Sequence, residues 1–251
     1  MSAILNVAAY RFVAIDDPAE VAEWLRGLCQ THALKGSILV AAEGINLFLA
    51  GEPARLREML GDLAGDPRFQ GLATRFSESR SRPFRRLRVK VKREIISFNG
   101  RVRGPEAPKA PAVSPVKLRQ WLRQGHDDAG RELVLLDTRN QQEVAFGSFK
   151  QATKLPIDRF TQLPEALEAH RDQWQGKAVV SFCTGGIRCE KAAPWMAEAG
   201  YGDVLQLEGG ILGYFEHVGG EGYEGGCFVF DERVVLDAAL QPMPSNGAPS
   251  A

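Results

Sequence analysis

The 251-residue sequence predicts an α/β protein with two domains. Three observations carry this prediction. Short apolar segments alternate with amphipathic stretches of helical periodicity, which is the pattern of strands packed against helices. Four prolines in residues 104–115 separate two such alternating regions. Each region is also long enough to bury a core of its own.

The first hundred residues predict the order strand, helix, strand, strand, helix, strand, strand. The strands are expected at Leu5–Ala14, Ser37–Ala42, Ile45–Ala50, Leu72–Ser77 and Leu87–Ser97, and the helices at Pro18–Leu28 and Pro53–Ala64. Asp16 and Asp17 precede the first helix as capping candidates, and a proline begins the second. This order is typical of a ferredoxin-like (acylphosphatase-like) α+β sandwich, a fold that by itself implies no activity.

The second region predicts a mostly parallel sheet with ligands at the C-terminal ends of its strands. Strands are expected at Leu133–Leu136, Ala178–Phe182 and Val204–Leu207, and helices at Pro115–Arg123, Leu163–Arg171, Cys189–Gly200 and Ile211–His217. We therefore expect a first domain over 1–100, a semi-rigid proline-rich linker over 101–115 and a second domain over 116–220. The remaining 221–251 form a C-terminal extension that is expected to be disordered at its end.

Composition and cysteine usage argue against several classes of protein. The chain is 44% hydrophobic and 25% charged, which is ordinary for a globular protein. No apolar stretch has the length of a membrane span and no signal-peptide pattern begins the chain, so a cytoplasmic protein without membrane attachment is expected. The four cysteines (Cys29, Cys183, Cys189 and Cys227) form no Cys-x-x-Cys pair. This argues against a disulfide scaffold and against a metal site.

The net charge is zero, but basic residues are concentrated in one segment. Eleven Lys/Arg and only two acidic residues lie between Arg75 and Arg103. In the last predicted strand of the first domain, basic and apolar residues alternate, which makes one face of that strand basic. Such a block predicts contact with a polyanion, nucleic acid above all, with a solvated strand face as the alternative. The candidate contact residues are Arg82, Arg85, Arg86, Arg88, Lys90, Lys92 and Arg93.

The most informative motif is the loop Cys183-Thr184-Gly185-Gly186-Ile187-Arg188 between a buried strand and a helix. Backbone N–H groups converge at such a helix N-terminus and favour a thiolate over a thiol. We therefore predict Cys183 as the nucleophile, with a buried structural cysteine as the alternative. Arg188 is its predicted catalytic partner, either holding an anionic group or bridging to an acid of the fold. The loop is one residue shorter than the Cys-x5-Arg loop that wraps a phosphate, so a phosphatase is not expected.

Three other residues are expected near this loop. Asp137 and Arg139 follow a buried strand, where they either shape the rim of the site or form a structural ion pair. Cys189 is a candidate resolving thiol. Successive helical residues do not share a face, however, so Cys189 is expected to point away from Cys183.

Several segments resemble a known family. Residues 133–220 resemble a rhodanese domain, so the predicted fold is a ferredoxin-like domain followed by a rhodanese α/β domain. More narrowly, the chain is similar to the TrhO (YceA-like) tRNA uridine hydroxylases, which join these two domains. The matching segments are 41–46, 89–95, 136–140, 183–192 and 227–233. The resemblance departs at the end of the chain, which lacks the cysteine-rich tail of many relatives.

The resemblance implies O2-dependent hydroxylation of uridine 34 of tRNA to 5-hydroxyuridine. It also implies O2 as co-substrate and the anticodon stem-loop as partner. The sequence shows no flavin fingerprint, haem motif or metal triad, so no cofactor is evident. Cys183 is then either the nucleophile, whose addition to C6 of uracil makes C5 enolate-like, or the carrier of a redox-active persulfide. One alternative is a thiosulfate-type sulfurtransferase whose N-terminal domain docks a partner. Another is a non-enzymatic RNA-binding or redox-sensing protein. The sequence leaves the oligomeric state open.

Overall fold

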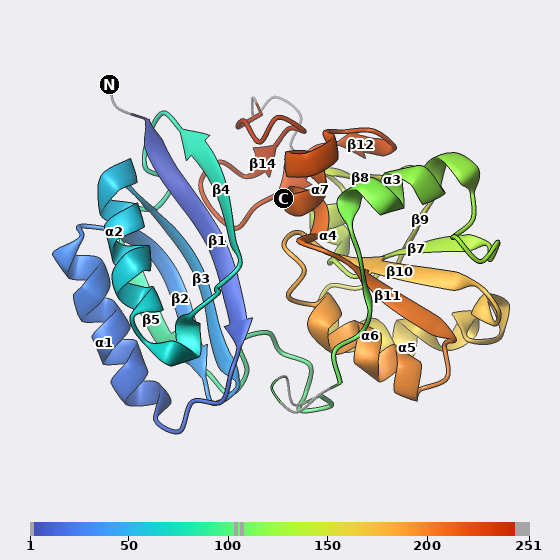
Figure 1. Cartoon of the computed structure of the whole chain (residues 1–251), viewed down its shortest axis with the longest axis horizontal. Helices are drawn as coiled ribbons and strands as arrows, with labels where there is room; N and C mark the ends of the chain where they lie inside the picture. Colours follow the sequence, from blue (N-terminus) through green and yellow to red (C-terminus); the bar gives the residue numbers. More distant parts are fainter. Residues whose placement is uncertain (1–2, 103–104, 106–107, 244–251) are drawn as a thin grey trace. The chain divides into compact units, whose positions relative to one another are not determined.

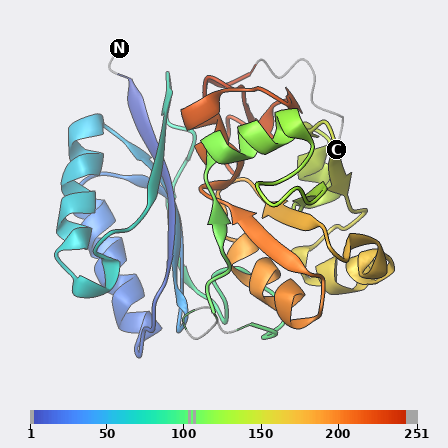
Figure 2. The ribbon, with the colours of Figure 1, turned by 45° about the vertical axis from the view of Figure 1, so that its right-hand side comes forward.

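A computed structural model describes residues 3–102, 105 and 108–243 of the chain, which forms two compact units (Figures 1 and 2). Unit 1 consists of Met1–Glu106 together with Phe230–Arg233, and unit 2 of Ala107–Val229 together with Val234–Ala251. Part of the predicted linker and the predicted disordered end of the C-terminal extension lie outside the described residues.

Unit 1 is a five-stranded sheet with two helices on one face (Figure 1). Its elements are β1 (Ile4–Phe12), α1 (Pro18–Thr31), β2 (Lys35–Ala41), β3 (Gly44–Gly51), α2 (Pro53–Ala64), β4 (Thr74–Ser79) and β5 (Leu87–Val91). The strand order is β4-β1-β3-β2-β5, antiparallel except for the parallel pair β2 and β5. The predicted ferredoxin-like order is therefore confirmed, and β5 adds a fifth strand at one edge.

Local sequence explains where the two helices of unit 1 begin. The Asp17 carboxylate accepts the N–H groups of Ala19 and Glu20, both at 3.0 Å, ahead of α1. Glu52 caps α2 in the same way. Such caps satisfy N–H groups that have no partner inside the helix. The apolar sides of both helices then pack with alternate strand residues into one buried core. Leu25 of α1, for example, is fully buried in this core.

The strand predicted over Leu87–Ser97 is wrong beyond Val91. The Glu43 carboxylate accepts the N–H of Ile95 at 2.8 Å, and the side-chain amide of Asn46 donates to the carbonyl of Ile95 at 3.4 Å. Side chains of the β2–β3 hairpin region thus take the backbone groups that a longer strand would need for its ladder. Val91 is itself 49% exposed, so the predicted alternation of basic and apolar residues ends before it.

Unit 2 is built on a five-stranded sheet with helices on both faces (Figure 1). Its strands are β6 (Ala112–Val113), β7 (Leu133–Asp137), β8 (Gly147–Phe149), β9 (Ala152–Lys154), β10 (Ala178–Phe182), β11 (Asp203–Leu207), β12 (Tyr223–Gly225), β13 (Cys227–Phe228) and β14 (Val235–Leu236). Its helices are α3 (Pro115–Gln124), α4 (Gln141–Val144), α5 (Leu163–Leu167), α6 (Cys189–Glu198) and α7 (Gly210–Val218). The five-stranded sheet has the order β6-β11-β10-β7-β9, and its strand pairs are parallel, as predicted.

Three parts of unit 2 differ from the sequence-based expectation. Ala112–Val113, expected in the linker, is the edge strand β6, where neighbouring prolines are tolerated because an edge strand need not donate on both sides. The helix expected over Leu163–Arg171 is the short α5 followed by 3-10 turns. The C-terminal extension contributes β12, which pairs with β8. No helix within residues 3–102, 105 and 108–243 is long and apolar enough to cross a membrane.

Candidate active site and basic strand

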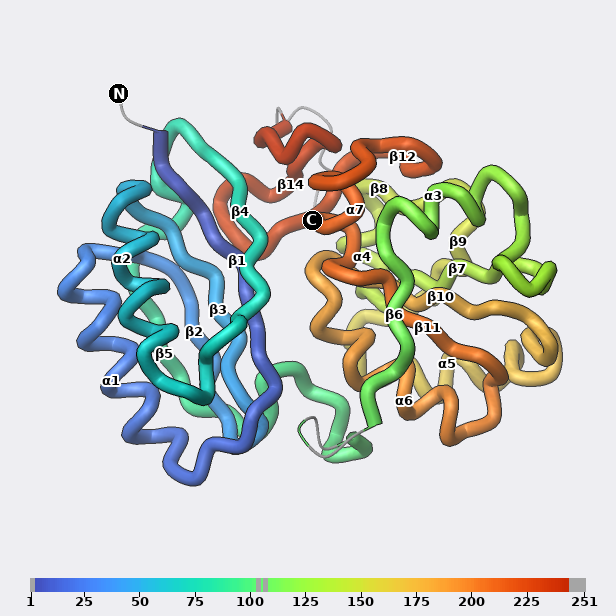
Figure 3. The backbone as a smooth tube through the Cα atoms, in the orientation of Figure 1, coloured from blue at the N-terminus to red at the C-terminus, as the bar shows by residue number. Residues whose placement is uncertain are grey.

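Cys183 directly follows the C-terminal end of β10. This strand is the central one of the parallel sheet (Figure 3). The loop after it leads directly into α6, which begins at Cys189. Ligand-binding groups of open parallel sheets collect at this edge. The Cys183 side chain is only 1% exposed, and its Sγ accepts the N–H of Gly186 at 3.1 Å. The loop backbone therefore turns inward onto the sulfur.

The surroundings of Cys183 favour its thiolate. Burial by itself raises the pKa of Cys183, but a hydrogen bond from the Cys189 thiol, the Arg188 charge and the N–H groups of Arg188 and Gly186 outweigh it. Together they lower the pKa of Cys183 to about 6. Burial, the hydrogen bond to Cys183 and the Cys183 charge raise the pKa of Cys189 well above its usual value. At neutral pH the pair therefore consists of one thiolate and one thiol.

The hydrogen bond from Cys189 that helps to lower the pKa of Cys183 argues against the expectation that Cys189 points away from Cys183. Cys183 lies in the loop before the helix, so helical periodicity does not govern how the two residues face. The Oγ1 of Thr138 lies 3.8 Å from the Sγ of Cys189 and donates to the carbonyl of Phe182 at 2.9 Å. Cys189 is thereby held near the C-terminal ends of β7 and β10.

Arg188 bridges to an acid of the fold. Its Nη1 and Nη2 donate to the two carboxylate oxygens of Glu143 at 3.0 and 2.8 Å, and the two residues are 6% and 3% exposed. Glu143 also accepts the N–H of Asn140 at 3.0 Å at the start of α4. Sequence reasoning missed Glu143. The spacing of an Asn followed three residues later by Glu predicts a helix cap but not a partner for Arg188.

Asp137 and Arg139 form a fully buried ion pair, each 0% exposed. Arg139 donates from Nε and Nη2 to the two Asp137 oxygens at 2.9 and 2.6 Å, and from Nη2 to the carbonyl of Gly147 at 2.6 Å. The Ser148 hydroxyl donates to Asp137 at 2.7 Å. The pair thus joins the end of β7 to β8, which is the geometry of the structural bridge rather than of an accessible rim.

The remaining loop residues are Thr184, Gly185 and Ile187. Thr184 is buried, and its hydroxyl donates to the carbonyl of Phe228 at 3.4 Å. Gly185 and Ile187 are partly exposed. The loop is therefore tied at one end to β13, and it reaches the surface at its middle.

The N-terminus of α7 holds the Cys183 loop in place. The N–H of Ile211 donates to the carbonyl of Cys183 at 2.9 Å, and the N–H of Leu212 to that of Thr184 at 3.0 Å. Gly210 has a φ of +61°, and a Cβ there would lie 2.4 Å from the carbonyl oxygen of Cys183. Only glycine allows this close approach. Sequence reasoning gave the glycines at 209–210 no role in positioning the loop.

We expect Gly210→Ala to displace the loop and to destabilise unit 2. A methyl group at this position meets backbone atoms, which costs about 1–3 kcal/mol beyond the strain of a positive φ. Gly219→Ala is the matched control, since Gly219 follows the same helix with a φ of +77° and has open space around its Cβ. Denaturant unfolding of both variants measures the difference. Equal losses of unfolding free energy would contradict the packing role of Gly210.

The lowered pKa predicts a pH profile for the thiolate. Since the Cys183 thiolate forms as pH rises through about 6, its ultraviolet absorbance should appear well below the range of an ordinary thiol, whose pKa is about 8.5. The transition should be absent in Cys183→Ser. A wild-type transition at or above the ordinary value would show that burial dominates at this site.

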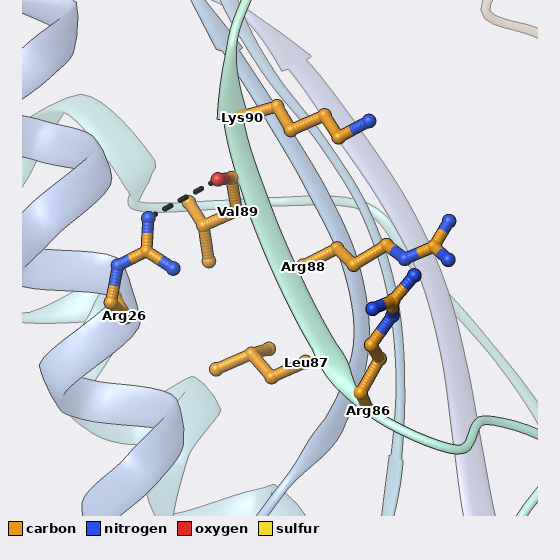
Figure 4. A pocket seen from close by; sticks show the side chains of 6 residues that line it. All are labelled: Arg26, Arg86, Leu87, Arg88, Val89 and Lys90. Atoms are coloured by element: carbon orange, nitrogen blue, oxygen red, sulfur yellow. Dashed lines mark hydrogen bonds between the residues drawn. The ribbon is translucent and has the colours of Figure 1, made fainter.

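Three of the predicted basic residues line one surface pocket. It lies beside the edge strand β5 and has a volume of about 430 Å³ (Figure 4). The lining residues are Arg26, Arg86, Leu87, Arg88, Val89 and Lys90. In Figure 4 the side chains of Arg86, Arg88 and Lys90 extend from one side of the strand. Arg26 lies on the other side, where its Nη2 donates to the carbonyl of Val89 at 3.2 Å.

The other four predicted contact residues are exposed but do not line this pocket. Arg85 donates to the carboxylate of Glu232 at 2.8 Å within unit 1. Arg82 precedes β5, while Lys92 and Arg93 follow it. The structure therefore brings together Arg86, Arg88 and Lys90, which we call the basic strand.

Comparison with known proteins agrees with this two-unit architecture. Residues 4–95 match the family model of the UPF0176 acylphosphatase-like domain, and residues 117–217 match that of the rhodanese-like domain. A solved Saccharomyces cerevisiae homologue of single-domain rhodanese and the Cdc25 phosphatase catalytic domain aligns with 45% of this chain and 84% of its own. Its identity to this chain is 19% and the TM-score is 0.37.

Relatives of high identity span nearly the whole chain. The tRNA uridine(34) hydroxylase of Xanthomonas euvesicatoria pv. vesicatoria is 60% identical over 240 residues, which cover 96% of this chain and 97% of the relative. The tRNA uridine(34) hydroxylase of Bordetella pertussis is 55% identical and covers 96% of this chain and 99% of its own. The chain therefore belongs to the family of the tRNA uridine(34) hydroxylases.

Proposed function

We propose that this protein hydroxylates uridine 34 of tRNA at C5, with O2 as co-substrate and Cys183 as the nucleophile, to form 5-hydroxyuridine. The observation that carries the proposal is the stabilised Cys183 thiolate at the C-terminal edge of the parallel sheet. It occurs in a chain whose relatives, 55–60% identical over nearly their full length, are tRNA uridine(34) hydroxylases. Because tRNA is the proposed substrate, we place the activity in the cytoplasm.

The chemistry of uracil explains why a thiolate is useful for this reaction. C5 of the free ring is a poor nucleophile, but addition of the Cys183 sulfur to C6 converts C5 into an enolate carbon that takes up O2 and a proton as a C5 hydroperoxide. Two electrons and two protons from an external thiol reductant then cleave the O–O bond, which leaves a hydroxyl group on C5 and releases the second oxygen atom as water. Loss of the C5 proton and departure of the sulfur then restore the ring with a hydroxyl group at C5. The wobble base leaves its stack to reach the thiolate. Arg188 stabilises the thiolate by its charge, and Glu143 holds Arg188 in place.

The basic strand is proposed to bind phosphates of the anticodon stem-loop. Three cations along one edge strand match a row of backbone phosphates, and such contacts position an RNA without reading its bases. Sequence-specific recognition of RNA mostly targets loops with unstacked bases, and position 34 lies in such a loop. The basic strand therefore supplies affinity, whereas the choice of base belongs to the site around Cys183.

We expect the variant Arg86→Gln/Arg88→Gln/Lys90→Gln to bind tRNA more weakly and with a shallower salt dependence. Removal of one cation that neutralises a phosphate reduces the slope of log affinity against log salt by about 0.7–0.9. The control Arg55→Gln/Arg57→Gln/Lys150→Gln removes the same charge from exposed positions elsewhere. Filter binding across a salt series measures both slopes. If both variants show the same slope of log affinity against log salt, the basic strand does not bind tRNA and is only a solvent-exposed face.

The test of the proposed function is incubation of the purified full-length protein with unmodified tRNA under ¹⁸O2, followed by mass spectrometry of the nucleosides. We expect 5-hydroxyuridine that carries ¹⁸O, located at position 34 by fragment mapping. Product labelled from H2¹⁸O instead would refute O2 as co-substrate. If no 5-hydroxyuridine forms but thiosulfate loads a persulfide onto Cys183, the protein is a sulfurtransferase.

A further inference from the structure

We propose that Arg26 of α1 is a further RNA-binding residue, and that Arg26 and the basic strand hold phosphates of the RNA backbone from two sides of the β5 edge. We call this set of four cations the phosphate clamp. The inference rests on the proposed function, because it takes tRNA as the ligand. It goes beyond that function by adding a residue of another element and by stating where the RNA backbone runs.

The pocket at the β5 edge has cations on both of its sides. Its volume is about 430 Å³, and it is lined by Arg26 and by residues 86–90. In Figure 4 Arg26 approaches β5 from the side of α1, whereas the basic strand extends from the other side. A phosphate group in this pocket therefore meets positive charge from two directions.

Two hydrogen bonds hold the Arg26 side chain at the strand. Its Nη2 donates to the carbonyl of Val89 at 3.2 Å, and its Nε donates to the carboxylate of Glu23 at 3.3 Å. The side chain is still 36% exposed. A guanidinium carries more N–H donors than these two bonds use, so its planar fork stays open to a phosphate. Arg26 is thus a positioned cation rather than a freely moving one.

The β2–β5 ladder decides which backbone groups of β5 point out of the sheet. The N–H of Gly36 in β2 donates to the carbonyl of Arg86 at 3.2 Å, so the peptide groups of Arg86 face β2. Because backbone groups alternate in direction along a strand, those of Leu87 and Val89 point outward. Arg26 covers the outward carbonyl of Val89, which would otherwise repel an anion. The outward N–H groups stay available as donors.

The same features argue against a second protein strand as the occupant of this edge. An open edge strand can pair with a strand of another chain. Such a ladder needs the Val89 carbonyl, which already accepts a hydrogen bond from Arg26. Pairing with a second copy would also place two rows of cations against each other, and like charges opposite one another are unfavourable. An anionic chain is therefore the better match.

The spacing of the cations fits a row of phosphates. Residues two positions apart on a strand are separated by about 6.6 Å, which is close to the separation of successive phosphates on an RNA strand. Arg86, Arg88 and Lys90 can therefore each face one phosphate of consecutive nucleotides. Arg26 is bound at Val89 and so lies level with the middle of this row. The RNA backbone then runs along β5.

The test is filter binding of tRNA to the full-length Arg26→Gln variant across a salt series. We expect the slope of log affinity against log salt to fall by about 0.7–0.9, as for the loss of one phosphate contact. Arg55→Gln is the matched control and should keep the wild-type slope. Both arginines lie on helices of unit 1 and pair with a glutamate three residues away, at 3.3 Å for Arg26 and 3.2 Å for Arg55.

Three further measurements separate a phosphate contact from other roles. Arg26→Lys keeps a cation and should retain most of the slope, whereas a purely structural role would lower the unfolding midpoint of Arg26→Gln and leave its slope unchanged. Phosphate contacts carry no sequence information, so Arg26→Gln should weaken two tRNAs of different anticodon sequence equally. Uridine monophosphate has a single phosphate and should not bind at concentrations at which tRNA saturates the protein.

Each failure has its own signature. If Arg26→Gln keeps the slope of Arg55→Gln while the triple variant of the basic strand loses slope, RNA contacts only one side of β5 and the clamp is wrong. If uridine monophosphate binds as tightly as tRNA, the pocket holds a free nucleotide and not the RNA backbone. Failure of the proposed hydroxylation is read separately, since a protein that binds tRNA through the clamp but forms no 5-hydroxyuridine would refute the activity alone.

Discussion

Cys183→Ser is expected to abolish hydroxylation of tRNA. A serine hydroxyl is not ionised at neutral pH, so the addition to C6 that activates C5 cannot occur. We expect the rate to fall by about 10³-fold or more, as is usual when an enzyme loses its nucleophile. The measurement is mass spectrometry of tRNA nucleosides from a deletion strain that carries the wild-type or the variant protein.

The control for this experiment is Cys29→Ala in the same strain, since Cys29 belongs to unit 1. It should restore 5-hydroxyuridine to the wild-type level. Full restoration by Cys183→Ser would exclude both the thiolate and the persulfide routes, because each requires the sulfur of Cys183. Absence of 5-hydroxyuridine with the wild-type protein would instead make sulfur transfer the leading function.

Asp137→Asn is expected to give the largest loss of stability among substitutions in unit 2 that we consider. It leaves the Arg139 guanidinium charged and without its carboxylate in a site where both side chains are 0% exposed. Breaking a buried ion pair in this way costs about 3–5 kcal/mol. That is a large share of the roughly 5–15 kcal/mol that stabilise a domain. Denaturant unfolding followed by a probe in unit 2 measures the loss.

Two comparison variants separate the buried charge from other effects. The double variant Asp137→Leu/Arg139→Met removes both charges and should be more stable than Asp137→Asn alone. Glu221→Gln breaks the exposed pair with Arg123 and should change the unfolding transition little. If Asp137→Asn unfolds like Glu221→Gln, the ion pair between β7 and β8 is not a major source of stability.

Elements with strong local signals were predicted well from sequence. The helix over Pro53–Ala64 has the predicted bounds, because proline fixes its first turn and Glu52 caps it. The parallel sheet of unit 2 followed from the alternation of buried strands and helices. The strand over Leu87–Ser97 was predicted too long, because Glu43, some fifty positions earlier, binds the N–H of Ile95. Such a contact leaves no periodic trace in the sequence.

The candidate site likewise has some features that local sequence predicts and others that depend on contacts between distant segments. The sequence by itself determined the order of elements in both units and the nucleophilic loop at Cys183. These depend on apolar periodicity, on capping residues and on the spacing of one short motif. Only the tertiary structure decided that Arg188 pairs with Glu143, that Cys189 helps to lower the pKa of Cys183 and that Gly210 supports the loop. These contacts depend on how β10, α4, α6 and α7 pack against one another. The residue pattern within one element does not predict which residues of another element it will contact.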